Sequence, residues 1–299
     1  MSHLCRKNLK PIAGDLDRNN KFPTEQIQHL GKLGLMAINV DPDYGGSGLD
    51  TLSISLAVEE IARGCGGTGA IVSIHNCLYA CLLNRLGTTK QKEQFLRPCT
   101  SGNIGAFALS ESEAGSDVAA LSTTATKDGD HWLLNGMKAW VTSAYEAKAA
   151  VIFATVDKTL QHKGITGIAR ASLDSAVEYA SKRKAFGTYL IDMPAVKGHI
   201  ADVALRHESA RLLTWKAASM KDACERTTKY SSMAKIAASQ CATFAAHTAM
   251  QIMGGMGYVN DMPAERHYRD ARITEIYGGV TDIQKLVIAD QVIREMGYE

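Results

Sequence analysis

The sequence predicts an α+β protein in which a short β-rich segment separates two helical parts. Residues 1–103 combine helical spacing of apolar residues with Gly-rich turns, and residues 104–167 carry short β-branched runs divided by Gly, Asp and Asn. From 168 to 299 the chain is helical and rich in alanine, which allows helices to approach closely. We therefore expect a helical domain at 1–103, a thin β-domain at 104–167 and a helical bundle at 168–299.

In the N-terminal part, apolar residues from Ile27 to Leu35 recur at helical spacing, and Thr24 after Pro23 favours a helix start. We expect this helix over 24–36, followed by a turn at 41–50 where Pro and Gly-Gly interrupt the pattern. Further helices are expected at 51–63, 69–86 and 88–97.

Four runs in the middle part have the composition of β-strands: IGAFALS, STTATKD, HWLLNG and AAVIFAT. Asn135-Gly136 is a hairpin-turn signal. The strand pattern ends abruptly at 157–167. The sheet is therefore expected to have an open edge, and open edges invite association.

The longest helical pattern covers 223–253 and predicts a helix packed within a bundle. Apolar residues at three-four spacing define its expected core face: Met233, Ile236, Ala237, Cys241, Phe244, Ala245 and Ile252.

Composition argues against several classes of protein. A net charge of +2 and a pI near 8.1 give no bulk electrostatic case for nucleic acid or a membrane surface. We find no apolar run close to the roughly 20 residues that span a bilayer. The seven cysteines are scattered without a C-x-x-C pair, which indicates a reduced compartment and no structural metal. The opening MSHLCRKNLKP lacks the apolar core of a signal peptide, so no targeting segment is expected in this chain.

Two motifs in the β-rich part are suited to holding an aromatic heterocycle. ALSESEAGSDVAA (108–120) follows a strand with a turn whose hydroxyls and backbone N–H groups can hydrogen-bond a heterocycle or a phosphate. KAWVTSA (138–144) is expected to place Trp140 on a strand as a flat face, with Thr142 on the same side. Taken singly, the first motif is an ordinary polar turn and the tryptophan an ordinary buried residue.

Two further motifs lie in the helical part. In RKAFG (183–187) a helix is expected to end at Gly187, and Arg183 could clamp a pyrophosphate or lie on a solvated face. In QIMGGMG (251–257) the glycines are expected to end a helix and to expose backbone N–H groups. Glycine is also the routine residue at helix C-termini, so this signal is weak alone.

In this order, the four motifs resemble the acyl-CoA dehydrogenase family, and 208–218 and 261–277 are similar to its short-chain, butyryl-CoA-type branch. The resemblance runs along nearly the whole chain. It implies an N-terminal helical domain, a middle β-domain and a C-terminal four-helix bundle, usually assembled as a tetramer. It also implies FAD as cofactor and α,β-dehydrogenation of a short acyl-CoA thioester in mitochondrial fatty-acid β-oxidation, with electrons passing to an electron-transfer flavoprotein.

The resemblance assigns roles to individual residues. Thr142 matches a residue that hydrogen-bonds near the hydride-accepting nitrogen of the flavin. Arg183 matches an arginine that binds the pyrophosphate across a subunit interface, and 251–255 match a turn that meets a neighbour's cofactor. The residues expected to bind FAD are Phe107, Leu109, Ser110, Gly115, Ser116, Trp140, Val141, Thr142, Arg183, Gln251, Gly254 and Gly255. The residues expected to bind substrate are Ser116 and Gly279.

The chain departs from this branch at the catalytic turn. Relatives read Tyr-Glu-Gly-Thr there, and their glutamate removes the α-proton; this chain reads Tyr-Gly-Gly-Val at 277–280. Gly278 therefore stands at the base position and has no group that accepts a proton. Val280 lacks the hydroxyl that helps bind FAD in relatives. The nearby acids Glu275 and Asp282 are expected not to replace the base.

The chain also lacks a segment that the family has. After KGIT (163–166) relatives continue with further strands and the first part of a bundle helix, whereas this chain goes directly into 167–180. The missing piece includes the substrate-binding segment and the base position of another branch. The first family helix is cut short as well, and Pro194 replaces a glutamine that contacts FAD. We therefore expect a reduced middle β-domain.

Three functions remain open. The chain is a working short-chain dehydrogenase with an unexpected base, a catalytically impaired flavin-binding or helical interaction protein, or a shortened product without stable function. Because the base is missing, the mechanism favours the impaired protein or the shortened product over the working enzyme. Enzymatic activity is therefore left open. The expected partners are a short-chain acyl-CoA, an electron-transfer flavoprotein and further copies of the chain, without nucleic acid, membrane or metal.

Overall fold

The structure is a computed structural model that describes Cys5, residues 7–155 and residues 168–298. The expected junction after KGIT (163–166) therefore lies outside the described residues, as does the abrupt end at 157–167.

Internal contacts divide the chain into two compact units. Unit 1 comprises the residues up to Pro23, Thr51–Ala70 and the chain from Lys163 onward. Unit 2 comprises Thr24–Asp50 and Ile71–His162.

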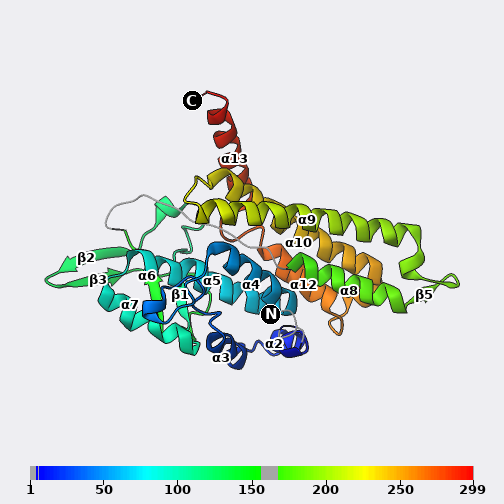
Figure 1. The fold of residues 1–299 in the computed structure, drawn as a ribbon, viewed down its shortest axis with the longest axis horizontal. Helices are drawn as coiled ribbons and strands as arrows, with labels where there is room; N and C mark the ends of the chain where they lie inside the picture. Colours follow the sequence, from blue (N-terminus) through cyan, green and yellow to red (C-terminus); the bar gives the residue numbers. More distant parts are fainter. Residues whose placement is uncertain (1–4, 6, 156–167, 299) are drawn as a thin grey trace. The chain divides into compact units, whose positions relative to one another are not determined.

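Unit 1 is built around the expected helical bundle. Helices α8 (Ile168–Lys182), α9 (Pro194–Asp222), α10 (Thr228–Met253) and α12 (Pro263–Ile273) pack side by side, and α4 (Thr51–Gly64) lies against α8 and α9 (Figure 1). One buried cluster joins α8, α9, α10 and α12, and small side chains dominate it: Ala169, Val203, Ala210, Ala238, Cys241, Ala242, Ala245, Ala246 and Ala271. Alanines at these positions let the helices approach closely. The predicted C-terminal bundle is thus confirmed.

Helix α10 is buried over more of its circumference than its apolar spacing predicts. Of the seven residues expected to form its core face, only Cys241, Ala245 and Ile252 are fully buried. Ser232, Lys235 and eight further residues outside the expected set are buried too. The reason is that α10 packs against α8, α9, α12 and α13, so several of its faces are covered.

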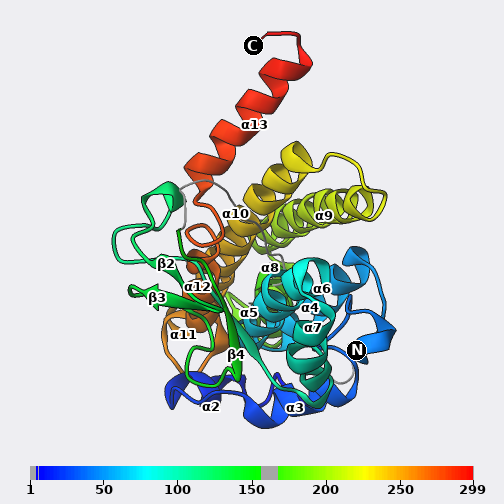
Figure 2. The same ribbon diagram turned by 90° about the vertical axis from the view of Figure 1, so that its left-hand side faces the viewer.

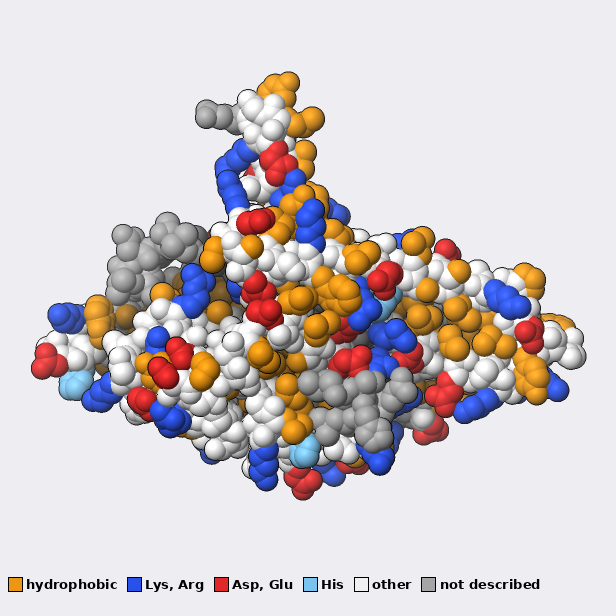
Figure 3. All heavy atoms as spheres, viewed as in Figure 1, with side chains coloured by type: hydrophobic (Ala, Val, Ile, Leu, Met, Phe, Trp, Pro, Cys, Tyr) orange, Lys and Arg blue, Asp and Glu red, His pale blue; other side chains and the backbone are white. Residues whose placement is uncertain are grey.

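Helix α13 (Thr281–Glu295) extends away from the bundle in both views (Figures 1 and 2). It carries uncovered hydrophobic side chains, which Figure 3 shows along the projecting helix. These residues are Leu286, Val292 and Ile293 on the helix and, just beyond its end, Met296 and Tyr298. The smaller elements of unit 1 are α2 (Ala13–Arg18), β5 (Lys184–Ala185), β6 (Thr188–Tyr189) and α11 (Gly255–Tyr258).

The expectation that a helix ends at Gly187 was wrong. Helix α8 ends at Lys182, and Lys184–Tyr189 form a small antiparallel hairpin. Phe186 and Gly187 make its turn with φ values of 51° and 80°. Both values lie in the left-handed region that two-residue hairpin turns require, so the glycine serves this turn rather than a helix end.

In unit 2, the helices fall where the apolar spacing predicts them. They are α3 (Thr24–Lys32), the end of α5 (Gly66–Ile74), the π-helical turn η2 (His75–Ala80), α6 (Cys81–Leu86) and α7 (Thr89–Phe95). A capping box between Thr88 and Gln91 starts α7.

The segment Gly66–Leu86 is apolar enough to need a separate explanation. With 21 residues and a mean hydropathy of 1.2, it is long and apolar enough by composition alone to cross a membrane. The expectation of no apolar run close to bilayer-spanning length was therefore wrong for this segment. Its polar residues His75 and Asn76 are fully buried and hydrogen-bonded to other parts of unit 2, which is the pattern of a core helix.

The π-helical turn holds unit 2 together through hydrogen bonds to the backbone. His75 Nε2 donates to the carbonyl oxygen of Met36 at 2.8 Å, and the N–H of Gly105 donates to His75 Nδ1 at 3.1 Å. The side chain of Asn76 accepts from the N–H of Ile38 at 3.0 Å and donates to the oxygen of Leu35. Burial lowers the pKa of His75 to about 4, so the ring is neutral at pH 7.

Unit 2 is therefore expected to lose stability in mild acid. The pKa of His75 is lower in the folded than in the unfolded chain, where it is about 6.5, so stability falls as the pH drops from 6.5 towards 4. The loss should approach about 3 kcal/mol. Urea unfolding at a series of pH values measures it. A His75→Gln variant should flatten the dependence, whereas His29→Gln, on an exposed residue of α3, should leave it unchanged. Equal pH dependence in all three proteins would contradict this role.

The four predicted strands of the middle part are confirmed. Strands β1 (Gly105–Ala108) and β4 (Ala149–Ile152) pair in parallel, and β2 (Thr124–Asp128) and β3 (His131–Asn135) pair antiparallel. Within the described residues they form two separate two-stranded sheets and no closed barrel.

The predicted position of the hairpin turn was wrong. The chain reverses at Gly129-Asp130, between β2 and β3, and Asn135-Gly136 instead ends β3. A Cβ atom on Gly136 would lie 2.4 Å from Thr123 Oγ1. Gly136 is thus required by the close approach of a neighbouring segment rather than by a turn.

Candidate functional site

In unit 2, the two motifs of the β-rich part lie together. Strand β1 carries Phe107, whose ring packs on Phe153 with ring centroids 4.9 Å apart. Leu109 and Ser110 follow the strand and are half-buried. The N–H of Ala139 donates to the oxygen of Ser110 at 2.9 Å. This bond holds the segment that contains Trp140 beside the end of β1.

A buried ion pair fixes these two segments. Glu111 is 4% exposed, and Lys138 Nζ donates to its Oε1 at 2.7 Å and to the oxygen of Leu109 at 2.8 Å. The N–H groups of Ser122 and Thr123 donate to the same carboxylate at 2.7 and 3.0 Å. Burial alone would raise the pKa of Glu111, but these hydrogen bonds together hold it well below its ordinary value.

Neither Glu111 nor Lys138 is among the site residues that the sequence predicts. The two residues are 27 positions apart, and a charged residue next to a strand is usually solvated. Only the pairing of the segments puts both charges in the interior, so no local signal in the sequence identifies them.

Trp140 is not on a strand, which corrects the sequence prediction. It lies in the irregular segment after β3 and has a φ of 59°, a left-handed value that is uncommon for a residue with a side chain. Its side chain is 91% exposed. Val141 and Thr142 follow it and are half-buried. The ion pair with Glu111 fixes Lys138, two residues before Trp140, and so restrains the segment that carries Trp140.

The turn after Glu111 is open to a ligand. Gly115 and Ser116 are exposed, and a Cβ atom built on Gly115 would have no atom within 4 Å. The backbone at this point can therefore be approached closely.

In unit 1, the remaining cofactor candidates lie at one end of the bundle. Arg183 directly follows α8, and Gln251 and Gly254 stand at the end of α10, where Gly254 is the C-cap with a φ of 59°. One apolar cluster joins these two helix ends through Ala180 and Met253. A Cβ atom on Gly254 or Gly255 would have no atom within 4 Å. The expectation that the glycines end a helix is confirmed.

The turn at 277–280, where the resemblance would place the base, lies elsewhere on the bundle. Glu275, just before it, contacts Thr243 of α10, and Gln251 is eight residues further along the same helix. At 1.5 Å per residue this places Gln251 roughly 12 Å along the axis from Thr243. Within one chain, Arg183 and Gln251 therefore do not join the turn at Gly278.

The turn itself offers no side-chain base. Gly278 and Gly279 have φ values of 64° and 92°, in the left-handed region that favours glycine. Val280 is the N-cap of α13 and provides no side-chain hydrogen bond to the helix. A threonine or serine usually provides that bond.

The acid on the N-terminal side of the turn is already engaged. Thr243 Oγ1 donates to Glu275 Oε1 at 2.5 Å, and Arg272 Nη1 lies 3.0 Å from Oε2. The carbonyl oxygen of Glu275 accepts from Lys235 Nζ at 3.2 Å and from the N–H of Thr281 at 3.1 Å. Both its carboxylate and its backbone therefore hold the turn in shape.

The acid on the other side points to solvent. The Asp282 side chain is 83% exposed, and Lys285 Nζ lies 3.4 Å from its carboxylate. Asp282 is therefore directed to solvent and to Lys285 rather than held against the turn.

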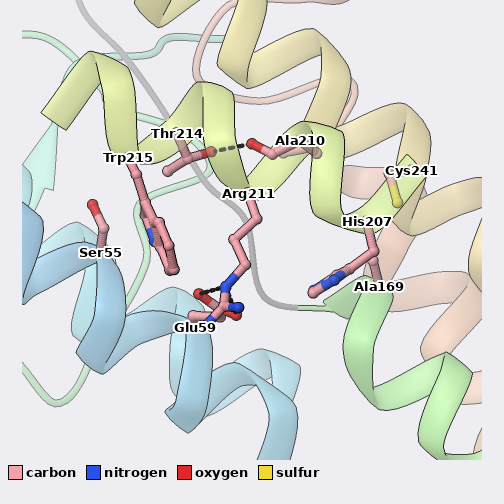
Figure 4. Close-up of a pocket in the computed structure, with 10 residues that line it drawn as sticks. Ser55, Glu59, Ala169, His207, Ala210, Arg211, Thr214, Trp215 and Cys241 are labelled. Carbon is pink, nitrogen blue, oxygen red and sulfur yellow. Dashed lines mark hydrogen bonds and ion pairs between the residues drawn. The ribbon is translucent and has the colours of Figure 1, made fainter. Parts of the chain in front are cut away.

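A small cavity in unit 1 contains none of the predicted site residues. It has a volume of about 20 Å³, enough for one water molecule. Figure 4 shows Arg211 reaching from α9 between Glu59 and Trp215, with Arg211 Nε 3.0 Å from Glu59 Oε1. Burial raises the pKa of Glu59, although Arg211 acts to lower it. Burial also lowers the pKa of His207. This cavity is too small for a thioester.

A larger cavity of about 520 Å³ lies among α2, α4, α8 and α12. It too contains none of the predicted site residues. Most of its charged groups are paired across the cavity wall, as in Arg63 with Asp174 and Lys10 with Glu178. No group of three or more His, Cys, Asp and Glu side chains that could hold a metal ion occurs in the described part of the chain.

Comparison with known proteins agrees with this arrangement of helices and strands. Family models for the acyl-CoA dehydrogenase N-terminal, middle and C-terminal domains match residues 1–103, 106–192 and 160–293. The chain is 44% identical to the mitochondrial short-chain specific acyl-CoA dehydrogenase of Bos taurus over 97% of its own length and 87% of that protein. It is 34% identical to the short-chain specific acyl-CoA dehydrogenase of Clostridium acetobutylicum, over 97% of this chain and 95% of the relative.

A solved structure shows the same fold. Butyryl-CoA dehydrogenase from Megasphaera elsdenii superposes with a TM-score of 0.90 at 30% identity, covering 98% of this chain and 97% of that one. The fold and the matched segments define an acyl-CoA dehydrogenase architecture of helical, β and helical parts. The chain belongs to the acyl-CoA dehydrogenase family.

Proposed function

We propose that this protein is a short-chain acyl-CoA dehydrogenase-like flavoprotein that binds FAD but lacks the group that removes the substrate α-proton. The observation that carries the proposal is the turn at Gly278. Two left-handed glycines occupy it, and the acid before it, Glu275, is held by Thr243 and Arg272. The chain therefore has features of a flavin site and lacks a free carboxylate at the turn.

The described residues fit FAD. Trp140 presents an uncovered aromatic face, and the buried pair Glu111–Lys138 restrains the segment that carries it. The open backbone at Gly115 and Gly254 leaves N–H groups that can be approached by a phosphate or a heterocycle. When bound, FAD supplies hydride acceptance. The chain itself would orient the flavin and the thioester.

Other positions reduce the fit. Val280 has the shape of threonine without its hydroxyl. Pro194 occupies the first turn of α9, where a backbone N–H would have no hydrogen-bond partner within the helix. Proline is thus well suited to starting α9. In this proposal, however, Pro194 replaces a glutamine whose side-chain amide contacts FAD in relatives.

FAD is therefore expected to bind more weakly than in an intact short-chain relative. Each lost hydrogen bond is worth roughly 0.5–1.5 kcal/mol. Equilibrium dialysis should thus give a dissociation constant raised about tenfold or more. Val280→Thr should tighten binding by about twofold to tenfold because it restores one hydroxyl at constant shape.

The control for this measurement is Leu86→Thr, at an exposed leucine of α6 that belongs neither to α13 nor to the predicted cofactor residues. It should leave the dissociation constant unchanged. FAD held as tightly by the unmodified protein as by an intact relative would refute the weakened site. An absence of any flavin absorbance after incubation with excess FAD would refute the flavoprotein assignment itself.

We also propose that the chain lacks an internal segment of its relatives. The alignment with the bovine protein runs over 360 positions, and this chain has 299 residues, so at least 61 of those positions have no counterpart in it. Such a gap supports the loss of β-strands and of the substrate-binding segment. It also agrees with the two-stranded sheets of unit 2.

As partners we propose a short-chain acyl-CoA, an electron-transfer flavoprotein and further copies of this chain. The uncovered apolar residues of α13 support assembly into a homo-oligomer. The separation of Arg183 and Gln251 from Gly278 within one chain supports a cofactor shared between neighbouring subunits. A mitochondrial location is supported by the mammalian relatives, although bacterial relatives are similar as well.

A further inference from the structure

The larger cavity of unit 1 contains two arginines without an ion-pair partner. Its walls come from α2, α4, α8 and α12, and its volume of about 520 Å³ is that of a small-molecule site. Two ion pairs described above engage four of its charged side chains, which leaves Arg18, Arg266 and the exposed Asp261. Within the described part of the chain, Arg18 and Arg266 form neither an ion pair nor a side-chain hydrogen bond.

The two guanidinium groups converge on one point above Gly14 of α2. Arg18 Nη1 and Arg266 Nη1 lie 3.2 and 3.3 Å from the position that a Cβ atom on Gly14 would take, so the two nitrogens are no further apart than the sum of these distances. Arg18 follows Gly14 by about one helical turn, and Arg266 comes from α12. Two positive charges at this separation repel each other. An anion between them offsets that repulsion.

The acids nearest to these arginines are engaged elsewhere. Asp17 accepts from Arg269 Nη1 and Nη2 at 3.0 and 2.7 Å. The carboxylate of Asp270 lies against Gly66 at the start of α5, where burial raises its pKa to about 6. Both carboxylates add negative charge near Arg266, but neither lies within ion-pair distance of it. The Nη1 groups above Gly14 are therefore available to a ligand.

The same wall contains an uncharged polar group, the imidazole of His267. The residue is 9% exposed, and burial lowers its pKa to about 3, so the ring is neutral at pH 7. Nδ1 has no hydrogen-bond partner within the described residues. A buried nitrogen without a partner costs free energy, which a polar ligand or an ordered water beside the ring can recover.

We propose that this cavity binds a small organic anion whose phosphate or carboxylate group lies between Arg18 and Arg266. Guanidinium groups donate paired hydrogen bonds that match the oxygens of both kinds of anion. Such bonds are about 2.7–2.9 Å long, so two oxygens of one anionic group can reach both Nη1 atoms. Glycine is unfavourable within a helix compared with alanine, but at position 14 it keeps this space free of a side chain.

The rest of the cavity favours an aliphatic body for this ligand. Its described lining includes the apolar side chains of Pro11, Met262 and Pro263, and it contains no Phe, Tyr or Trp on which a base could stack. We therefore expect a short aliphatic phosphate or carboxylate rather than a nucleotide. The cavity contains none of the residues proposed to bind FAD or the thioester, so its test is independent of the proposed function.

Calorimetric titration of the full chain with ethyl phosphate and with propionate tests the site. The two probes share an ethyl body and differ in the anionic group, so the tighter of them identifies the group that the site prefers. That probe is expected to bind once per chain with a dissociation constant of about 1 mM or lower. Arg18→Gln and Arg266→Gln should each weaken it by about tenfold or more, because each removes charge-assisted hydrogen bonds.

Two further variants exclude binding elsewhere. Arg226→Gln, at an exposed arginine between α9 and α10 that does not line the cavity, should leave the dissociation constant unchanged. Arg183→Gln, at the predicted pyrophosphate residue, should leave it unchanged as well. Arg18 is exposed, so Arg18→Gln should keep the helix content of the unmodified protein in circular dichroism. An absence of saturable binding of either probe, binding that persists in Arg18→Gln and Arg266→Gln, or binding lost only in Arg183→Gln overturns the proposal.

Discussion

Oxidation of butyryl-CoA by this protein, followed with an artificial electron acceptor, is expected to stay at or near background. Gly278 has no proton-accepting group, Glu275 is bound by Thr243 and Arg272, and Asp282 points to solvent. General acid–base catalysis is typically worth about 10²–10⁴-fold in rate. A turnover number lower than that of an intact short-chain relative by at least this factor is therefore expected.

Restoring the glutamate alone should rescue little. Gly278→Glu places a side chain at a φ of 64°, which costs roughly 1–2 kcal/mol for a residue other than glycine. Positioning of the thioester contributes as much to rate as proton transfer does, and the proposed missing segment would provide it. Restoring both the glutamate and that segment should give activity, provided that Pro194 is tolerated.

One outcome would show that the base has been misidentified. If the unmodified chain turns over within about tenfold of an intact relative, an acid other than the family glutamate must act. Glu275→Gln and Asp282→Asn would then be the next variants to measure.

Glu111→Gln is expected to destabilise unit 2 by about 3–5 kcal/mol, because it leaves the buried Lys138 charge without its partner. The effect should also weaken FAD binding, since the pair holds the segment of Trp140 against Ser110. Because the pKa of Glu111 is depressed in the folded protein, its contribution is present above about pH 4.3 and is lost as the pH falls below that value.

Urea unfolding measures the loss, and hydrogen exchange of peptides from 105–123 and 136–152 locates it in unit 2. Glu113→Gln, two residues further on and exposed, is the matched control and should change the free energy of unfolding by less than about 0.5 kcal/mol. The double variant Glu111→Gln/Lys138→Met should be more stable than Glu111→Gln alone, because no buried charge remains. A Glu111→Gln effect as small as that of the control would contradict the stabilising role of the ion pair between Glu111 and Lys138.

The sequence predicts the large elements of this fold well and the local geometry of its site less well. Helical spacing locates α4, α7 and the long helix from Gly66 to Leu86 because each buries one continuous face. The core of α10 was incompletely predicted, since helices on several sides bury residues such as Ser232 and Lys235 that a single apolar face does not include.

Glycine-based signals were the least reliable. Asn135-Gly136 suggested a hairpin turn, but Gly136 is required by the close approach of Thr123. Gly187 suggested a helix end, but it forms part of a two-residue hairpin turn. The segment that carries Trp140 is restrained by an ion pair between Glu111 and Lys138, 27 positions apart, which spacing cannot reveal. That Gly278 has no proton-accepting side chain, in contrast, can be read directly from the sequence, and the family resemblance is what suggests that this position would hold the base.

Proton abstraction can be measured separately from electron transfer, and this is the most direct test of the central claim. The protein is incubated with FAD and butyryl-CoA in D₂O without an electron acceptor, and deuterium at the α-carbon is followed by mass spectrometry, with an intact short-chain relative in parallel. The account predicts no α-exchange above the protein-free rate while the relative exchanges. Exchange by the unmodified chain at a rate comparable to that of the relative would contradict it.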